Sequence, residues 1–170
     1  YQPIRHILNS AGIERFPQAH FDMIRLGIGL YGVSATHQEK IQTVSTLKTH
    51  IAQIKHLAAG ETVGYSRRGK LNRNTTTATL PIGYADGLNR KLGNGNGEVL
   101  VNGKLAPFIG NVSMDTCVVD ITGISANEGD EVTIFGDTPT ITQIADAIGT
   151  IPYEILTSIS QRVKRIYVQE

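Results

Sequence analysis

Tyr84 is the side chain of this sequence best suited to acid–base chemistry. It stands in Gly83-Tyr84-Ala85-Asp86-Gly87, directly after the apolar segment Ala78-Thr79-Leu80-Pro81-Ile82. A packing tyrosine normally lies within a strand, whereas a phenol on a glycine-rich turn can exchange a proton with a substrate. Met114-Asp115 follows further along the chain. Together these residues favour an enzyme. The alternatives are that Met114 belongs to the core and that Asp115 only satisfies backbone groups of its own turn.

Arg25 leads a second group of candidates near the start of the chain. It interrupts the apolar run 23–33 and is followed by Gly27-Ile28-Gly29. A buried guanidinium needs a hydrogen-bond acceptor, so Arg25 either pairs with a carboxylate such as Asp22 or donates to a ligand at the end of a barrel strand. Backbone amides beside glycines can also hold phosphate oxygens.

Two further candidates carry weaker signals on their own. Ser10 in Asn9-Ser10 can cap a helix or stabilise a turn, and Tyr153 follows a proline at an expected helix start, where packing or capping is the common role. The five histidines show no metal-ligand spacing, so we expect no metal site.

Composition excludes several classes of protein. The chain has 170 residues, 40% of them hydrophobic and 18% charged, with a net charge of +1. These values are ordinary for a globular protein, and we expect neither a nucleic-acid partner nor a membrane span. Cys117 is the only cysteine, and its neighbours indicate a buried thiol in a strand. We therefore expect a reducing, cytoplasmic location.

The first 35 residues have the texture of an α/β fold. Ile4, Ile7, Leu8 and Ala11 have helical spacing that Gly12 ends, and the run 23–33 predicts a strand covered on both faces. Residues 36–40 are polar, and we expect the domain boundary there, with domains at 1–35 and 36–170.

The second domain is predicted to be mainly β. We expect strands at 75–82, 98–101, 104–109, 116–121 and 131–135, a bulged strand at 47–57 and a closing strand at 162–168. Asn102-Gly103 predicts a tight hairpin, and helices should begin at Thr140 and Pro152. The expected fold is a small antiparallel β-barrel or sandwich with two short helices, preceded by the last helix and strand of an α/β barrel.

Several motifs in register resemble alanine racemase, a pyridoxal-phosphate enzyme that interconverts L- and D-alanine for peptidoglycan synthesis. They are His6–Gly12, Met23–Gly32, Ile82–Gly87, Gly110–Asp115 and, near the end of the chain, Pro152–Glu154 with Ile159–Ile166. They cover nearly the whole chain in the order expected for the C-terminal part of that family.

The resemblance implies a role for each candidate. Tyr84 looks like the base that acts on L-alanine, delivered into the partner subunit of a homodimer. Arg25 resembles the donor to the pyridine nitrogen of the cofactor, and Met114 resembles a substrate contact. Ser10, Gly27, Ile28 and Tyr153 resemble the phosphate-binding set, and His6 and Asp115 resemble supporting residues.

Two departures from the family pattern affect the expected activity. The family's Schiff-base lysine lies upstream of the motifs present here, and no lysine of this chain matches its motif. The first residue is Tyr1, so we expect the chain to be part of a longer polypeptide and to be inactive alone. Asn111 stands where many members carry an arginine at the substrate entrance, so the charge of the entrance should differ.

Three alternatives remain at this stage. The fold could serve a racemase of another amino acid such as serine, or a non-catalytic module for dimerisation or binding. A decarboxylase of similar fold fits less well, since it would be expected to carry a catalytic cysteine motif and an acidic residue where Arg25 stands.

Overall fold

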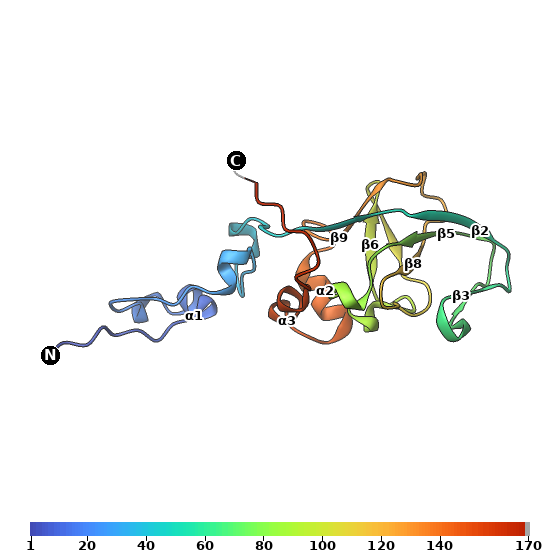
Figure 1. The fold of residues 1–170 in the computed structure, drawn as a ribbon. Helices are drawn as coiled ribbons and strands as arrows, with labels where there is room; N and C mark the ends of the chain where they lie inside the picture. The colour runs from blue at the N-terminus through green and yellow to red at the C-terminus, as the bar shows by residue number, and fades with distance from the viewer. Residues whose placement is uncertain (169–170) are drawn as a thin grey trace. The chain divides into compact units, whose positions relative to one another are not determined.

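The computed structural model describes residues 1–168 and divides the chain into two compact units (Figure 1). Unit 1 comprises Tyr1–Thr46, and unit 2 begins at Leu47. Within the described residues, no helix has both the length and the apolar character needed to cross a membrane.

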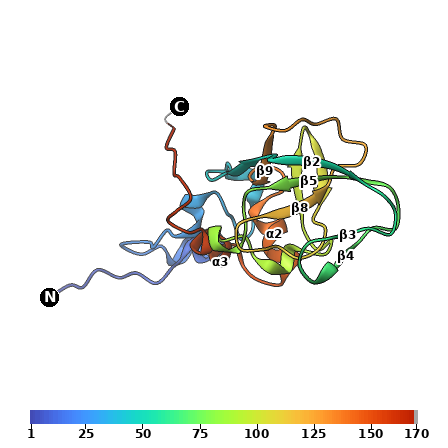
Figure 2. The same ribbon diagram turned by 45° about the vertical axis from the view of Figure 1, so that its right-hand side comes forward.

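Unit 2 is built from antiparallel strands in three sheets (Figure 2). The first sheet has the order β1-β9-β6-β7, the second β2-β5-β8 and the third β3-β4. Their bounds are β1 Leu47–His50, β2 Gln53–Leu57, β3 Thr62–Val63, β4 Gly69–Lys70, β5 Thr75–Leu80, β6 Glu98–Val101, β7 Lys104–Pro107, β8 Cys117–Asp120 and β9 Glu131–Phe135. The prediction of a mainly β fold is confirmed, although the strands form separate sheets and not one closed barrel.

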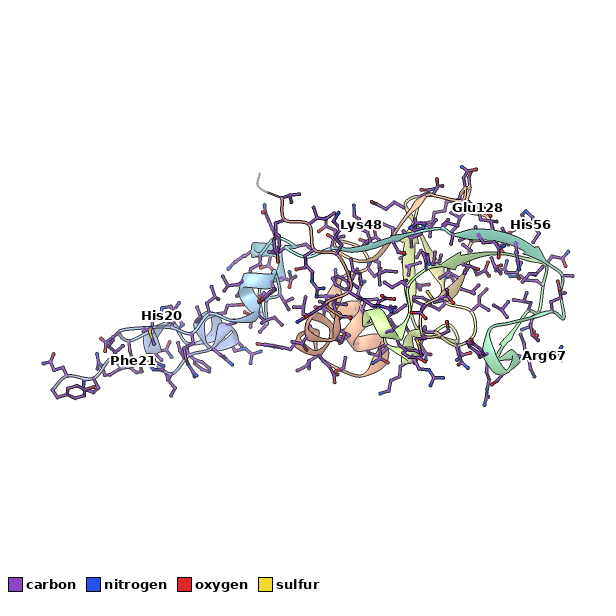
Figure 3. The ribbon with its side chains drawn as sticks, viewed as in Figure 1. His20, Phe21, Lys48, His56, Arg67 and Glu128 are labelled. Atoms are coloured by element: carbon purple, nitrogen blue, oxygen red, sulfur yellow. The ribbon has the colours of Figure 1, made fainter. Side chains whose placement is uncertain are left out.

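The segment 47–57 was predicted as one bulged strand, and this prediction is wrong. It forms two strands in different sheets, because β1 pairs with β9 whereas β2 pairs with β5. The chain changes sheets at Ile51 and Ala52, whose amides donate to the carbonyls of Asp130 and Thr79, both at 2.9 Å. Figure 3 shows Lys48 and His56 on the two successive strands.

One hydrophobic core fills the space between the two larger sheets. Phe108 of the segment after β7 forms a bridge with Val119 of β8, which joins the sheets on one side. The alternating strand residues point inward and are fully buried, among them Leu80, Val99, Val101, Val119 and Val132. This core is the scaffold on which the loops of unit 2 are mounted.

Local signals predicted the helices and the hairpin of unit 2 correctly. Thr140 and Gln143 form a reciprocal capping box at the start of α2, Ile141–Ile148, and Gly149 ends it in the left-handed region. Pro152 opens α3, Pro152–Ser158. Asn102 and Gly103 have the positive φ angles that a two-residue hairpin turn requires.

The expected closing strand at 162–168 is absent from the structure. Residues 161–163 form a turn and a bend, and residues 164–168 belong to no strand. The side chain of Arg165 donates to the carbonyls of Ser160 and Val163. Ile166, Tyr167 and Val168 are highly exposed. Apolar and β-branched residues alone do not make a strand where the sheet offers no partner edge.

Unit 1 begins differently from the prediction of a helix over residues 4–12. The segment 4–8 is extended, and α1 spans Ser10–Arg15. Asn9 is the N-cap, and its side chain accepts a hydrogen bond from the amide of Gly12 at 3.0 Å. Gly12 thus lies in the first turn of the helix and does not end it.

The predicted strand at 23–33 is also wrong in its bounds and its burial. The segment starts extended beside residues 5–8, where the backbone amide of Arg25 donates to the Leu8 carbonyl at 2.9 Å. It then forms the 3-10 turn η2, Ile28–Tyr31. Met23, Ile24, Leu26 and Leu30 are exposed. The apolar run indicated burial on two faces, which unit 1 by itself does not provide.

The remaining turns are short 3-10 helices. In unit 1, Figure 3 shows His20 and Phe21 at the turn that precedes Asp22, and Arg67 marks a turn of unit 2. The bounds are η1 Pro17–Ala19, η3 Gln38–Lys40, η4 Tyr65–Arg67, η5 Tyr84–Asp86 and η6 Arg90–Leu92.

Candidate functional site

The Tyr84 turn in unit 2 is fixed to the Met114 turn by backbone contacts. The amides of Tyr84 and Ala85 donate to the carbonyls of Ser113 and Met114, both at 3.0 Å. A Cβ atom on Gly83 would overlap these same carbonyl oxygens. The glycine is therefore required for the close approach, and the approach sets Tyr84 beside Met114.

Asp86 closes the Tyr84 turn from within. Its Oδ2 accepts the amide of Gly83 at 2.8 Å, and its Oδ1 accepts Nε of Arg162 at 2.7 Å. The hydrogen bond from Arg162 holds the pKa of the Asp86 carboxyl below its usual value, against the opposing effect of partial burial. Asp86 is thus an anion that anchors the turn.

Asp115 is tied to the same guanidinium. Nη2 of Arg162 donates to Oδ1 of Asp115 at 2.6 Å, and the amide of Ser160 donates to the Asp86 carbonyl at 3.0 Å. The sequence analysis assigned no role to Arg162 or to Asp86. An arginine shared by two distant carboxylates leaves no trace in local sequence patterns, since its two partners come from two other segments of the chain.

The predicted site side chains of unit 2 are open to solvent. Tyr84, Met114 and Tyr153 are 43%, 54% and 48% exposed. The guanidinium of Arg90 lies over the Tyr84 ring, 5.9 Å from its centroid, and orients the ring by a cation–π contact. The turn therefore presents the phenol outward, as a group that serves a substrate must be presented.

The hydrogen bonds of Tyr153 do not connect it to this group. It is the second residue of α3, and its carbonyl accepts the hydroxyl of Thr157 at 2.9 Å. Among the described residues its side chain forms no hydrogen bond with the other candidates. The structure therefore links Tyr84, Met114 and Asp115 directly, and it leaves the Tyr153 phenol free of them.

In unit 1, the Ser10 hydroxyl accepts hydrogen bonds from backbone amides of the glycine segment. Its buried hydroxyl oxygen accepts the amides of Gly27 at 2.9 Å and Gly29 at 3.2 Å. A Cβ atom at either glycine would point at this oxygen from 3.7 Å. Ser10 and Gly29 also border a hollow of about 540 Å³, and Ile28 is buried beside them. Both amides thus donate to the Ser10 oxygen, which leaves the hydroxyl hydrogen to be donated to a ligand such as an anion.

Arg25 is exposed and does not pair with Asp22, so the expectation of a buried arginine paired with Asp22 is wrong. Its Nη2 donates to the Ile7 carbonyl at 2.9 Å, next to His6, which is exposed on the same extended segment. Asp22 pairs with Arg5 at 3.0 Å instead. Arg25 therefore keeps its charge without a carboxylate partner among the described residues, and the guanidinium can donate to a ligand.

The described residues do not support cysteine-based or metal-based chemistry. Cys117 is buried in β8, and burial raises the pKa of its thiol far above the usual value. No cluster of metal-ligating side chains occurs within residues 1–168. Asn111 accepts a hydrogen bond from the amide group of Asn94 at 3.0 Å, which fixes it beside the Met114 turn.

Comparisons with known proteins converge on one family. Residues 44–167 match the family of the alanine racemase C-terminal domain, and residues 1–35 match that of the alanine racemase N-terminal domain. Alanine racemase 1 of Clostridium acetobutylicum is 43% identical over 98% of this chain and 45% of its own length. The enzyme of Helicobacter acinonychis is also 43% identical, over 96% of this chain and 47% of its own.

Solved structures agree with the sequence relatives. The alanine racemase of Bartonella henselae, with covalently bound pyridoxal phosphate, gives a TM-score of 0.93 at 37% identity, over 99% of this chain and 48% of its own. The enzyme of Streptomyces coelicolor gives 0.93 at 39% identity, over 99% and 47%. The chain spans about half the length of the relatives it matches. The order of its motifs, its mainly β fold and these matches agree, and the chain belongs to the alanine racemase family.

Proposed function

We propose that this chain is the C-terminal part of a pyridoxal-phosphate-dependent alanine racemase that interconverts L- and D-alanine and supplies D-alanine for peptidoglycan. One observation carries the proposal. In a chain of this family, the exposed phenol of Tyr84 is held on a turn that is hydrogen bonded to the Met114 turn at Ser113 and Met114. A base of this kind must be exposed to its substrate and fixed by its scaffold.

The donors of unit 1 fit the cofactor that this activity needs. The Ser10 hydroxyl, whose oxygen accepts the Gly27 and Gly29 amides, can donate its hydrogen to a phosphate group, and we propose that Gly27, Ile28 and Tyr153 complete the phosphate site. When bound, pyridoxal 5'-phosphate draws electrons from the α-carbon of the amino acid and makes its α-proton removable. A relative from Bartonella henselae holds this cofactor covalently.

Arg25 would set the electronic state of the cofactor ring. A guanidinium stays protonated at any relevant pH, so it donates to a pyridine nitrogen without giving up a proton. The ring nitrogen then stays unprotonated, which favours racemisation between two bases over side reactions. His6, beside the Ile7 carbonyl that Arg25 holds, would support this arrangement.

Tyr84 would move the proton on one face of the substrate. The deprotonated oxygen of Tyr84 would take the α-proton of L-alanine, and the phenol would return one when the reaction runs from D-alanine. Met114 would contact the substrate, and Asp115 would hold the turn. We propose that a lysine in the part of the family's sequence that this chain does not span serves the other face. The 170-residue chain alone is then expected to be inactive.

We further propose that residues 1–35 end the cofactor-binding α/β barrel and that residues 36–170 form the C-terminal β domain. The exposed apolar side chains of unit 1, such as Met23, Ile24 and Leu26, support a role as part of a larger barrel. The enzyme would work as a homodimer with active sites shared between subunits. A cytoplasmic location stays a prediction from the single cysteine.

The test is turnover of the complete enzyme with Tyr84→Phe. We expect kcat to fall by about 10²–10⁴-fold, with removal of the α-proton of L-alanine affected most, because this proton loses its acceptor. Loss of substrate-derived deuterium from α-deuterated L- and D-alanine measures the two directions separately. Tyr167→Phe is the control, since Tyr167 is also an exposed tyrosine of unit 2 and lies in none of the turns that carry candidate site residues.

Each of the other outcomes supports a different substrate, mechanism or function. A wild-type enzyme that racemises serine better than alanine would keep the mechanism and change the substrate. An active enzyme that is indifferent to Tyr84→Phe would refute the role of Tyr84. No turnover of any amino acid by the wild type would favour a non-catalytic binding or dimerisation module.

A further inference from the structure

We propose that Glu14 is a positioning residue that holds Ser10 in register with the phosphate-binding segment 27–28. The inference rests on the proposed function and deepens it, because it gives the phosphate site a second attachment point away from the ligand. Glu14 itself touches neither cofactor nor substrate in this proposal. It acts through the hydrogen bonds that tie helix α1 to the chain that follows the glycine segment.

Ser10 and Glu14 lie on the same face of α1, because residues four apart in a helix are neighbours on successive turns. Ser10 faces the start of the glycine segment. Its hydroxyl oxygen accepts the amides of Gly27 at 2.9 Å and Gly29 at 3.2 Å, which leaves its hydrogen for a phosphate oxygen. The face of α1 that carries Glu14 is therefore the face that meets this segment.

Glu14 binds the chain just after the glycine segment. Its Oε2 accepts the hydroxyl of Ser34 at 2.6 Å and also the hydroxyl of Thr36. These hydrogen bonds hold the pKa of the Glu14 carboxyl below its usual value, so the group is an anion at neutral pH and can only accept. The Ser34 oxygen in turn accepts the amides of Thr36 at 3.1 Å and His37 at 2.7 Å. One carboxylate thus holds a turn that is already closed on itself.

The segment between the two attachments is closed by its own hydrogen bonds. The Leu30 amide donates to the Gly27 carbonyl at 3.0 Å, and the Val33 amide donates to the Ile28 carbonyl at 3.4 Å. Ile28 and Val33 are also buried. The segment 27–33 therefore behaves as one piece of chain that is attached to α1 near each of its two ends.

Two attachments one helical turn apart restrain the segment more than one attachment does. The Ser10 bonds alone act as a pivot about which residues 27–33 can turn, and the Glu14 bonds block that rotation. A hydrogen bond to phosphate weakens when its distance or angle changes, so rotation at the pivot lowers the affinity for the phosphate group. The hydroxyls of Ser34 and Thr36 are not buried and can bond water instead, so the loss of Glu14 should cost the fold little.

The experiment measures the affinity of the complete enzyme, freed of cofactor, for pyridoxal 5'-phosphate and for pyridoxal, which has the same ring and no phosphate. We expect Glu14→Leu to weaken the binding of pyridoxal 5'-phosphate about 10-fold, the size of one hydrogen bond to a charged group. The affinity for pyridoxal should stay within about threefold of the wild-type value, because no phosphate contact exists to be lost. A residue that only supported the fold would affect both ligands alike.

Two further variants separate position from charge. Glu14 borders the same hollow as Ser10, where its negative charge opposes a bound phosphate group. Glutamine keeps an oxygen that accepts both hydroxyls and removes that charge, so Glu14→Gln should bind pyridoxal 5'-phosphate within about threefold of the wild type. Glu39→Leu is the matched control and should bind both ligands as the wild type does. Glu39 pairs with His37 at 3.2 Å in unit 1 and, within the described residues, bonds to neither α1 nor the glycine segment.

Amide exchange gives a readout that needs neither cofactor nor turnover. Peptides that cover residues 26–33 of the cofactor-free enzyme should exchange faster in Glu14→Leu than in the wild type, because the segment has lost one of its two attachments. Peptides that cover β5 of unit 2 should show no change, and Glu39→Leu should show no change in either region.

Three results would overturn the proposal. They are unchanged exchange over residues 26–33 in Glu14→Leu, equal weakening of both ligands by that variant, and a loss of affinity in Glu14→Gln as large as that in Glu14→Leu. Failure of the proposed function gives a different result. A wild type that binds pyridoxal 5'-phosphate more tightly than pyridoxal but racemises no amino acid refutes the activity, while the expected pattern of the variants still supports the positioning role.

Discussion

The two units of this chain place their functional groups by different means. In unit 2 every strand of the two larger sheets contributes to one buried core, and the Tyr84 turn is mounted on it. In unit 1 the buried apolar side chains are Leu8, Ile28 and Val33, whereas Met23, Leu26 and Leu30 are among many that are exposed. The donors around Ser10 are therefore held by local hydrogen bonds and those of unit 2 by a cooperative core.

This difference bears on where the site can tolerate change. A turn that is fastened to a packed core inherits the stability of the whole domain. The group formed by the Ser10 hydroxyl and the two amides bonded to it can adjust its geometry locally. The geometry of Tyr84 should thus be coupled to global unfolding, and the geometry of Ser10 should not.

The largest expected effect tests the core directly. Leu80→Ala in β5 removes a side chain with no exposure and should lower the free energy of unfolding by about 2–5 kcal/mol. Leu26→Ala in unit 1 removes an exposed side chain and should change it by less than about 0.5 kcal/mol. Urea unfolding of the 170-residue chain, followed by circular dichroism, measures both. Equal losses would show that unit 1 and unit 2 share one cooperative core.

A smaller effect is expected from two crowded glycines, one in each unit. Gly83→Ala forces a Cβ atom into the carbonyls of Ser113 and Met114, and overpacking of this kind costs about 1–3 kcal/mol. Gly32→Ala meets the Gln42 carbonyl at a positive φ, yet it should leave the urea midpoint of unit 2 unchanged. A shift of that midpoint by Gly32→Ala would contradict the separation of the units.

The smallest effect concerns acid. Arg162 keeps the pKa of Asp86 below its ordinary value of 3.8, so the pair stabilises the fold above that pH. This contribution is lost as the pH falls through the lower folded-state pKa. Asp86→Asn should therefore lower the urea midpoint near neutral pH and flatten its decline as the pH falls below about 4.

Asp22 provides the control for the acid prediction. Arg5 likewise lowers the pKa of Asp22, but the two side chains of this pair are 66% and 45% exposed in unit 1. Asp22→Asn should leave the pH dependence of the unit 2 transition unchanged. If Asp22→Asn altered it as much as Asp86→Asn, the comparison between the units would fail.

The sequence predicted those features that depend on neighbouring residues. The Asn102-Gly103 hairpin, the capping box at Thr140 and the proline start of α3 each need only a few adjacent side chains. The exposure of Tyr84 followed in the same way from its two flanking glycines. The cap signal of Asn9 was visible too, but the helical spacing of Ile4 and Ile7 outweighed it and moved the helix too early.

Features that depend on distant residues could not be predicted in this way. The change of sheet within 47–57 requires knowledge that β9 and β5 lie on either side of Ile51. The exposure of Arg25 follows from which elements cover residues 23–33, and the apolar run does not carry that information. The resemblance named Tyr84, Met114 and Asp115 as site residues, and the guanidinium that joins the two turns became visible only from the fold.

The passage from β1 to β2 has a consequence for how this domain can vary in evolution. Ile51 and Ala52 bond to both sheets over two residues, with the Gly129 amide also donating to the Ile51 carbonyl at 2.8 Å. An inserted residue there would shift two registers at once. The turns at Gly103 and Gly123 face open space, so changes in chain length among relatives should gather at these turns and spare the crossing.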